Sequence, residues 1–269
     1  MLQAQDTMNV RPGWNMVGAR STRALSEFTS EPPGIIISNY FGYSSGYSEA
    51  DTLMGGHGYW VKANQEGLII GGATSGFLCG TSTVEYAGKT YNTVQIGTQC
   101  WLKENLDVGT MITGTTEQTN NSTIEKYCYN NNTANCTTYG GLYQWNEAMQ
   151  YSTTPGTQGI CPTGWHIPTY AELQTLGTTV ANDGNALKAV GQGTGGGAGT
   201  NTSGFSALLS GFRNLIGSFA NVGSYTYYWS STEYNAAFAY YLYLYYNDSN
   251  IYFSNNNKEY GFSVRCIKD

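Results

Sequence analysis

Charge and histidine are scarce in this sequence. Lys, Arg, Asp and Glu together make up 11% of the 269 residues, with 12 basic against 18 acidic side chains and a net charge of −6. Nucleic-acid-binding proteins need a basic surface to neutralise phosphates, so no nucleic-acid partner is expected. The two histidines, His57 and His166, are too few for a histidine-rich metal centre, and we predict no metal site or cofactor.

Long apolar runs are lacking as well. A helix that crosses a bilayer needs about 20 consecutive apolar residues, whereas the apolar runs here are short pieces such as Gly67 to Ile70. We therefore expect no membrane span. Residues Met1 to Gln5 lack the basic and apolar regions of a secretion signal, which indicates a signal that is absent or was removed.

Glycine and tyrosine are plentiful instead, with 35 and 23 residues. With many Asn, Thr and Ser residues, they indicate numerous turns and short strands rather than long helices. The length favours two domains, and the small, polar stretch Gly71 to Gly76 is typical of a connector. We predict a small β module and linker over residues 1–76, with strands at Gly13–Gly18 and Gly58–Ala63, and a second domain over residues 77–269.

Six cysteines are present, and none belongs to a C-x-x-C pair. They lie at positions Cys79, Cys100, Cys128, Cys136, Cys161 and Cys266. An even number of cysteines with few histidines fits three disulfides better than zinc, and disulfides are typical of proteins outside the cytosol.

The second domain begins with hairpin patterns and contains little helix. Between Val84 and Glu104, strands alternate with glycine turns. Short helices are expected at Tyr143–Met149 and after Pro168, where Thr169-x-x-Glu172 can form a capping box. The tract from Gly191 to Gly204 is too poor in apolar side chains to build secondary structure and is predicted to be an exposed loop.

The C-terminal segment alternates with a period of two, which predicts strands with one core face and one tyrosine face. Leucines at 242 and 244 alternate with Tyr241, Tyr243 and Tyr245, and the pattern returns at Ile251–Ser254 after a turn. With Phe262–Cys266 as a third strand, the sequence predicts an antiparallel meander.

Several ordered motifs between residues 83 and 269 resemble the Fibrobacter major-paralogous-domain family. The motifs are Tyr91-x-x-Val94-x-Ile96-Gly97, Glu104-Asn105-Leu106, Cys128-Tyr129-Asn130-Asn131, Tyr143-x-Trp145, Gly159-Ile160-Cys161-Pro162-x-Gly164-Trp165-His166, Gly204-Phe205-Ser206-Ala207-Leu208, Trp229-Ser230-Ser231-Thr232-Glu233 and Gly261-Phe262-Ser263-Val264-Arg265-Cys266. The resemblance implies an α+β, C-type-lectin-like fold related to the sulfatase-modifying-factor group, with two short helices and antiparallel strands, behind the small all-β module. It also implies a bacterial surface, secreted or phage-borne protein.

A narrower resemblance concerns residues 225–260, which hold 11 Tyr and 6 Asn. This mixture, with Ser, Asp, Ala and Phe, resembles the variable proteins of diversity-generating retroelements, in which adenines of asparagine-type codons are rewritten. Leu242, Leu244 and Ile251 would maintain the fold between the variable positions.

The family resemblance implies a Cys161–Cys266 disulfide. Cys128 and Cys136 are expected to close a small loop, which leaves Cys79 for Cys100. A reactive thiol pair at positions 161 and 266, as in formylglycine-generating relatives, is the enzymatic alternative. Asp183-Gly184-Asn185 and Asn247-Asp248-Ser249-Asn250 offer oxygens to structural calcium but fit plain turns better.

We therefore expect a non-catalytic protein that binds a protein or glycan ligand on a cell surface. Rigid tyrosine rings would supply contact area and small polar groups would supply adaptable hydrogen bonds. The expected ligand-binding residues are Tyr225, Tyr227, Tyr234, Asn235, Ala237, Tyr240, Tyr241, Tyr243, Tyr245, Asn247, Tyr252 and Ser254. The alternative function is a carbohydrate-binding module or adhesin of a bacterial surface protein.

Overall fold

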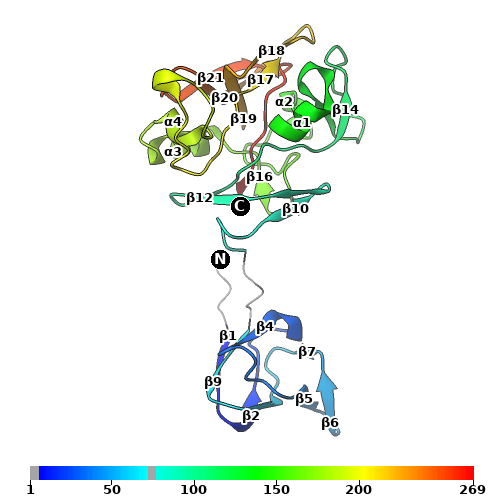
Figure 1. Ribbon diagram of the computed structural model, residues 1–269. Helices are drawn as coiled ribbons and strands as arrows, with labels where there is room; N and C mark the ends of the chain where they lie inside the picture. Colours follow the sequence, from blue (N-terminus) through cyan, green and yellow to red (C-terminus); the bar gives the residue numbers. More distant parts are fainter. Residues whose placement is uncertain (1–5, 72–76) are drawn as a thin grey trace. The chain divides into compact units, whose positions relative to one another are not determined.

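The computed structural model describes residues 6–71 and 77–269, which form two compact units with the division between residues 78 and 79 (Figure 1). The predicted boundary after residue 76 is close to that division, and residues 72–76 of the predicted linker lie outside the described residues. The elements of the N-terminal unit are β1 (Asp6–Val10), β2 (Gly13–Val17), β3 (Arg23–Ala24), η1 (Leu25–Glu27), β4 (Phe28–Glu31), β5 (Tyr40–Tyr43), β6 (Tyr47–Ala50), β7 (Thr52–Leu53), β8 (Tyr59–Ala63) and β9 (Gly67–Gly71).

The N-terminal unit is built from strands that pack around a small aliphatic core. One sheet has the order β1-β9-β4, a second has the order β2-β8-β5-β6, and β3 pairs with β7. The two strands predicted in this unit are confirmed as β2 and β8, which pair antiparallel with Asn15 opposite Val61. Leu53, Val61 and Ile69 are fully buried because alternate residues of these strands face inward.

The C-terminal unit is a mixed α+β structure, mostly strands with a few short helices. Its first elements are β10 (Val84–Tyr86), β11 (Lys89–Tyr91), β12 (Thr93–Ile96), β13 (Gln99–Leu102), β14 (Thr110–Ile112), β15 (Glu125–Tyr127), η2 (Tyr129–Asn131), α1 (Thr133–Tyr139), α2 (Trp145–Ala148) and β16 (Trp165–His166). The remaining elements are α3 (Tyr170–Thr179), α4 (Gly184–Leu187), η3 (Gly195–Gly197), β17 (Ser210–Arg213), β18 (Phe219–Val222), β19 (Tyr225–Glu233), β20 (Phe238–Tyr245), β21 (Tyr252–Asn257) and β22 (Ile267–Lys268).

One four-stranded sheet joins the two ends of the C-terminal unit. Its order is β12-β13-β22-β16, so the last strand of the chain lies between strands from the beginning and the middle of the unit. The predicted hairpins before it are confirmed as β10–β11 and β12–β13. Trp101 of β13 is opposite Ile267 of β22, and both side chains are buried.

Helix α3 confirms the predicted capping box. Thr169 accepts a hydrogen bond from the backbone N–H of Glu172, whose carboxylate accepts one from the backbone N–H of Thr169. The helix predicted at Tyr143–Met149 is shorter, because α2 comprises four residues and Tyr143 instead forms a strand-like bridge with Phe262. The helices α1 and α4 were not predicted from the sequence.

A five-stranded sheet of order β18-β17-β19-β20-β21 forms the second half of this unit (Figure 1). The prediction of Phe262–Cys266 as the third strand of the meander is wrong. Residue 262 bridges to Tyr143 and residue 263 to Tyr228, so this segment runs between layers, and β19 is the true neighbour of β20. Helices α3 and α4 pack on one face of this sheet, and α2 packs on the other.

The glycine-rich tract 191–204 is largely the exposed loop that was predicted, but it departs from the prediction at residues 195–197. It contains the short helix η3, and Gly197 is buried against the turn between β20 and β21. A Cβ atom at Gly197 would lie 2.3 Å from the backbone nitrogen of Asp248, so this position requires glycine. The tract is therefore part of the support of that turn.

All six cysteines form disulfides, in the three pairs expected from the sequence: Cys79–Cys100, Cys128–Cys136 and Cys161–Cys266. Three disulfides indicate an oxidising environment outside the cytosol. Over residues 6–71 and 77–269, no helix is both long and apolar enough to cross a membrane.

Candidate functional site

Three strands place tyrosines in rows on one face of the C-terminal sheet. Tyr225 of β19 is opposite Tyr245 of β20, and Tyr227 is opposite Tyr243, which is in turn opposite Tyr252 of β21. Directly paired residues project to the same side of a sheet, so these side chains share one face. We call these five half-buried residues the tyrosine face.

The rings of the tyrosine face stack on one another. The ring centroids of Tyr225 and Tyr245 are 4.3 Å apart at an interplanar angle of 23°, and those of Tyr243 and Tyr252 are 4.8 Å apart at 13°. Tyr227 joins the two rows, because its ring stacks at 5.8 Å on Tyr225 and at 5.9 Å on Tyr243. Such contacts fix the rings before any ligand arrives, which lowers the entropy that binding would cost.

The tyrosine side chains on this face become more buried from the Tyr225–Tyr245 row towards the Trp229–Tyr241 row. Tyr227 stacks on Phe262 at 4.7 Å, and burial raises its pKa above the usual value of 10.0. Tyr241, in the next row opposite Trp229, is only 8% exposed and contacts Phe262 at 5.1 Å. The expectation that Tyr241 projects to solvent is therefore not met, and we leave it out of the tyrosine face.

Two of the expected residues lie in a different cluster on the opposite face of β20. Tyr240 stacks on Tyr170 of α3 at 4.2 Å, and Tyr234 contacts Tyr240 edge-to-face at 5.5 Å. Tyr170 also contacts Phe253, whose position opposite Leu242 places it on the core side. Tyr234 is 53% exposed, so this second cluster has a surface of its own, but it is not continuous with the tyrosine face through β20.

The four other expected residues are exposed and lie in turns or at the strand edge. Asn235 and Ala237 are in the turn between β19 and β20, where the Asn235 side chain accepts hydrogen bonds from the N–H groups of Ala237 and Phe238. Asn247 is in the turn between β20 and β21. Ser254 is opposite Tyr241.

A buried lysine holds the turn that carries Asn247. The Lys188 side chain has no exposed surface, and its ammonium group donates to the backbone oxygens of Tyr245 and Asp248, each at 2.8 Å. The pKa of Lys188 is lowered overall, because the effect of burial exceeds the opposing effect of the nearby Asp248 carboxylate. Sequence reasoning missed this residue, because a lone lysine gives no signal that distinguishes it from a surface residue.

The two regions considered for calcium are hydrogen-bonded turns. Asp183 caps α4 by accepting from the N–H of Asn185, and Asp248 accepts from the N–H of Asn250 and from the hydroxyl of Tyr252. Within the described residues, no group of three or more His, Cys, Asp or Glu side chains is arranged to hold a metal ion.

His166 bridges two carboxylates rather than facing a nucleophile. Its Nε2 atom lies 3.1 Å from both carboxylate oxygens of Glu172, and its Nδ1 atom lies 2.7 Å from Asp269. The hydrogen bond to Glu172 raises the pKa of His166, against the opposing effect of burial. Burial alone would raise the pKa of Glu172, but hydrogen bonds from His166 and Thr169 lower it overall.

A second aromatic surface, which sequence reasoning also missed, lies on the N-terminal unit. Trp14, Phe41, Tyr47 and Trp60 line an open cavity of about 490 Å³. Trp14 is 55% exposed and Tyr47 is 67% exposed, although both are large and partly apolar. The signal was available in the sequence, since the alternation of β2 and β8 leaves Trp14 and Trp60 on the side away from Val61.

Comparison with known proteins identifies one family. Neither a search of curated proteins nor a search of solved structures found a match to the chain. A family model described as the Fibrobacter succinogenes major domain matches residues 94–268, which is more than half of the chain and most of the C-terminal unit. The matched segment contains every residue of the tyrosine face. The chain therefore belongs to the Fibrobacter succinogenes major domain family.

Proposed function

We propose that this chain is a non-catalytic binding protein whose tyrosine face contacts a protein or glycan on a cell surface. The observation that carries the proposal is the set of five stacked, half-buried tyrosines on adjacent rows of β19, β20 and β21. A solvent-facing aromatic array of this kind is typical of interaction surfaces, because rings supply apolar contact and hydroxyl groups supply hydrogen bonds.

The surroundings of the face also support recognition. Exposed Asn247 and Ser254 lie at its margins and can adapt their hydrogen bonds, whereas the rings between them are held in place by stacking. A rigid aromatic centre with an adaptable polar margin matches the anatomy of binding sites for macromolecules. A protein or glycan ligand fits better than a deeply enclosed small molecule, because the rings line a sheet surface rather than a cavity.

We further propose that the C-terminal unit has a C-type-lectin-like arrangement. It is supported by the sheet in which β22 joins β13 and β16, and by the disulfide Cys161–Cys266 beside it. An experimental structure that connected these strands in another order would contradict this assignment.

We also propose that a diversity-generating retroelement rewrites codons within residues 225–260, and that the protein is displayed on a bacterial surface or a phage. The proposal is supported by tyrosine and asparagine at solvent-facing positions of strands whose inward positions are Leu242 and Leu244. The encoding DNA would then carry a near-identical template repeat beside a reverse transcriptase. A missing repeat, or differences at bases other than adenine, would exclude the mechanism.

The binding function is tested by removing rings from the face and from elsewhere. The variant pair Tyr243→Ser and Tyr245→Ser is compared with Tyr86→Ser and Tyr151→Ser, two half-buried tyrosines of the same unit outside the face. Binding is measured to an array of surface glycans and to intact bacterial cells. Loss of about 2 kcal/mol, roughly 30-fold, is expected for the first pair and not for the second. Equal effects of both pairs would refute the proposal.

The glycan array also separates the main proposal from the alternative function. A carbohydrate-binding module would bind defined glycans through a site that remains in the tyrosine-face variant. A formylglycine-generating enzyme would instead require reactive thiols at Cys161 and Cys266, which are joined in a disulfide in the structure. A thiol count on the denatured, unreduced protein tests this, and we expect no free thiol.

A further inference from the structure

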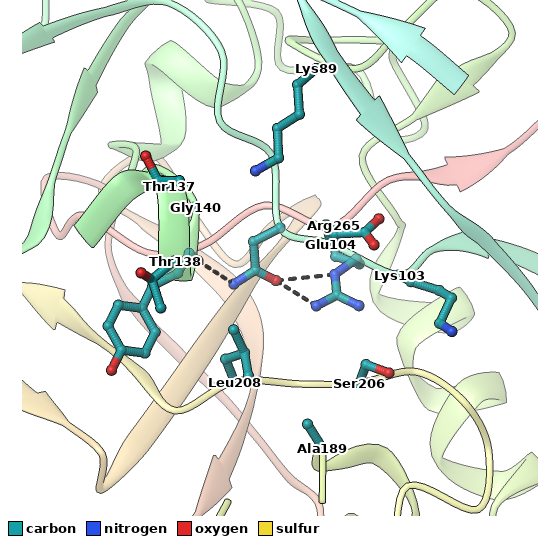
Figure 2. A pocket seen from close by; sticks show the side chains of 12 residues that line it. Lys89, Lys103, Glu104, Thr137, Thr138, Gly140, Ala189, Ser206, Leu208 and Arg265 are labelled. Atoms are coloured by element: carbon teal, nitrogen blue, oxygen red, sulfur yellow. Dashed lines mark hydrogen bonds between the residues drawn. The ribbon is translucent and has the colours of Figure 1, made fainter. Parts of the chain in front are cut away.

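A pocket on the C-terminal unit collects basic side chains in a protein that is acidic overall. This pocket, which we call the basic pocket, has a volume of about 330 Å³ (Figure 2). Lys89 of β11, Lys103 and Asn105 after β13, and Arg265 before β22 contribute to its lining. Three of the 12 basic residues of the chain thus share one pocket with a single carboxylate, that of Glu104.

Arg265 brings a buried positive charge to the base of this pocket. The residue is 1% exposed, and its Nε and Nη2 atoms donate to the Asn105 side-chain oxygen at 3.0 and 2.6 Å (Figure 2). Its Nη1 atom donates to the backbone oxygens of Leu102 and Phe205. These acceptors are all neutral, and within the described part of the chain no carboxylate forms an ion pair with Arg265. Its charge is therefore stabilised by these neutral acceptors and, without an ion pair, by the carboxylate of Glu104 in the same pocket.

The lysines of the pocket are only weakly neutralised. The Lys89 ammonium lies 4.0 Å from Asp107, and that carboxylate is engaged more closely by Lys126 at 2.5 Å. Over residues 6–71 and 77–269, the Lys103 ammonium has no hydrogen-bond or ion-pair partner. Glu104 accepts hydrogen bonds from the backbone and the side chain of Asn92, which occupies both of its oxygens. The side chains at the pocket carry three positive charges and one negative charge.

The rest of the lining provides hydroxyl groups and small apolar surfaces. Thr137, Thr138 and Ser206 contribute hydroxyl groups, and Ala189 and Leu208 contribute aliphatic carbon. A volume of about 330 Å³ corresponds to roughly ten water molecules, which exceeds the space that a simple inorganic ion needs. A ligand that fits this lining is anionic, hydroxyl-bearing and comparable to a single sugar in size.

We propose that the basic pocket binds a small organic oxyanion, a carboxylate or phosphate group carried on a sugar-sized molecule. The Lys89 and Lys103 ammonium groups contact the anionic oxygens, and the field of Arg265 draws the anion towards the base. The lining residues lie outside 225–257, so the site belongs to the framework and does not depend on the tyrosine face or on its proposed function.

The proposal is tested by calorimetric titration of the full-length chain with four probes: D-glucuronate, glucose 6-phosphate, glucose and inorganic phosphate. We expect binding of glucuronate, of glucose 6-phosphate or of both, weakened by added salt. The responding probe identifies the anionic group. Glucose should not bind, and inorganic phosphate should bind more weakly than the organic anions because it leaves the rest of the pocket empty.

Variants show whether binding occurs at this pocket. Lys103→Gln and Lys89→Gln each remove one cation, and each should weaken binding by about tenfold. Lys268→Gln is the matched control, a partly exposed lysine of the same unit outside the pocket. Melting curves confirm that all three variants fold. The proposal fails if neither organic anion binds, if glucose binds equally well, or if the pocket variants bind like the control. Inorganic phosphate that binds as tightly as the organic anions would mean an adventitious ion only.

Discussion

The three disulfides should stabilise the fold to very different extents, because they close loops of very different length. Cys161–Cys266 spans 105 positions and Cys128–Cys136 spans 8. In the chain-entropy model, the first crosslink contributes about 4.8 kcal/mol and the second about 2.5 kcal/mol, a difference of about 2.3 kcal/mol. All four side chains are buried, so replacing either pair with alanine removes similar packing. The difference between the two double variants therefore isolates the loop term.

Urea unfolding of the full-length chain measures this difference. Near-ultraviolet circular dichroism reports mainly on the C-terminal unit, which holds four of the six tryptophans. The variant Cys161→Ala with Cys266→Ala should lose about 2 kcal/mol more unfolding free energy than Cys128→Ala with Cys136→Ala. The loops closed by the three bridges do not overlap in sequence, so their losses should also add when pairs are combined. Equal losses, or a larger loss from the short loop, would refute the entropic reasoning.

Other expected outcomes concern the supports of the tyrosine face and the single bridging histidine. Lys188→Met should cost about 3 kcal/mol of unfolding free energy, because two part-buried carbonyl groups lose their donor; a loss below 1 kcal/mol in urea unfolding would contradict this. Gly197→Ala should loosen the turn that carries Asn247, since the added Cβ meets backbone; unchanged amide hydrogen exchange at residues 246–248 would count against it. The stability advantage of wild type over His166→Gln should be full below about pH 6.5, where the histidine is protonated even in the unfolded chain. It should disappear as pH rises through the raised pKa of the folded protein. On the acidic side, protonation of Glu172 below its own lowered pKa removes the partner charge. The measurement is the unfolding free energy of both proteins as a function of pH. A difference between wild type and His166→Gln that grew with rising pH would contradict this prediction.

Local patterns predicted much of the fold where one face of a strand is buried and the other is not. The alternation through Leu242 and Leu244 predicted β20, and Thr169 with Glu172 predicted the start of α3. Strand β19 lacks such alternation, because large residues fill both of its faces and Tyr228 and Trp229 are both buried. The Phe262–Cys266 segment alternates apolar and polar residues like a strand, but all five residues are buried because the segment lies between layers, where it forms only isolated bridges.

The candidate site was predicted by residue type but only partly by geometry. In the run of tyrosines through β20, adjacent residues project to opposite faces, which separates Tyr240 from Tyr243. Tyr241 has the correct parity, yet Phe262 covers it, and that contact depends on a segment distant in sequence. The Lys188 support and the basic pocket arise from long-range contacts too, and such contacts leave no periodic signal in one sequence.

The pairing register of β20 limits how this surface can change over generations. Exchange of one ring for another group at Tyr243 or Tyr245 alters the contact surface and leaves the inward leucines in place. Insertion or deletion of one residue within the strand would turn the leucines to water and the rings to the interior. New contact surfaces can therefore arise by substitution at these positions, whereas an insertion or deletion within the strand would disrupt the fold that presents them.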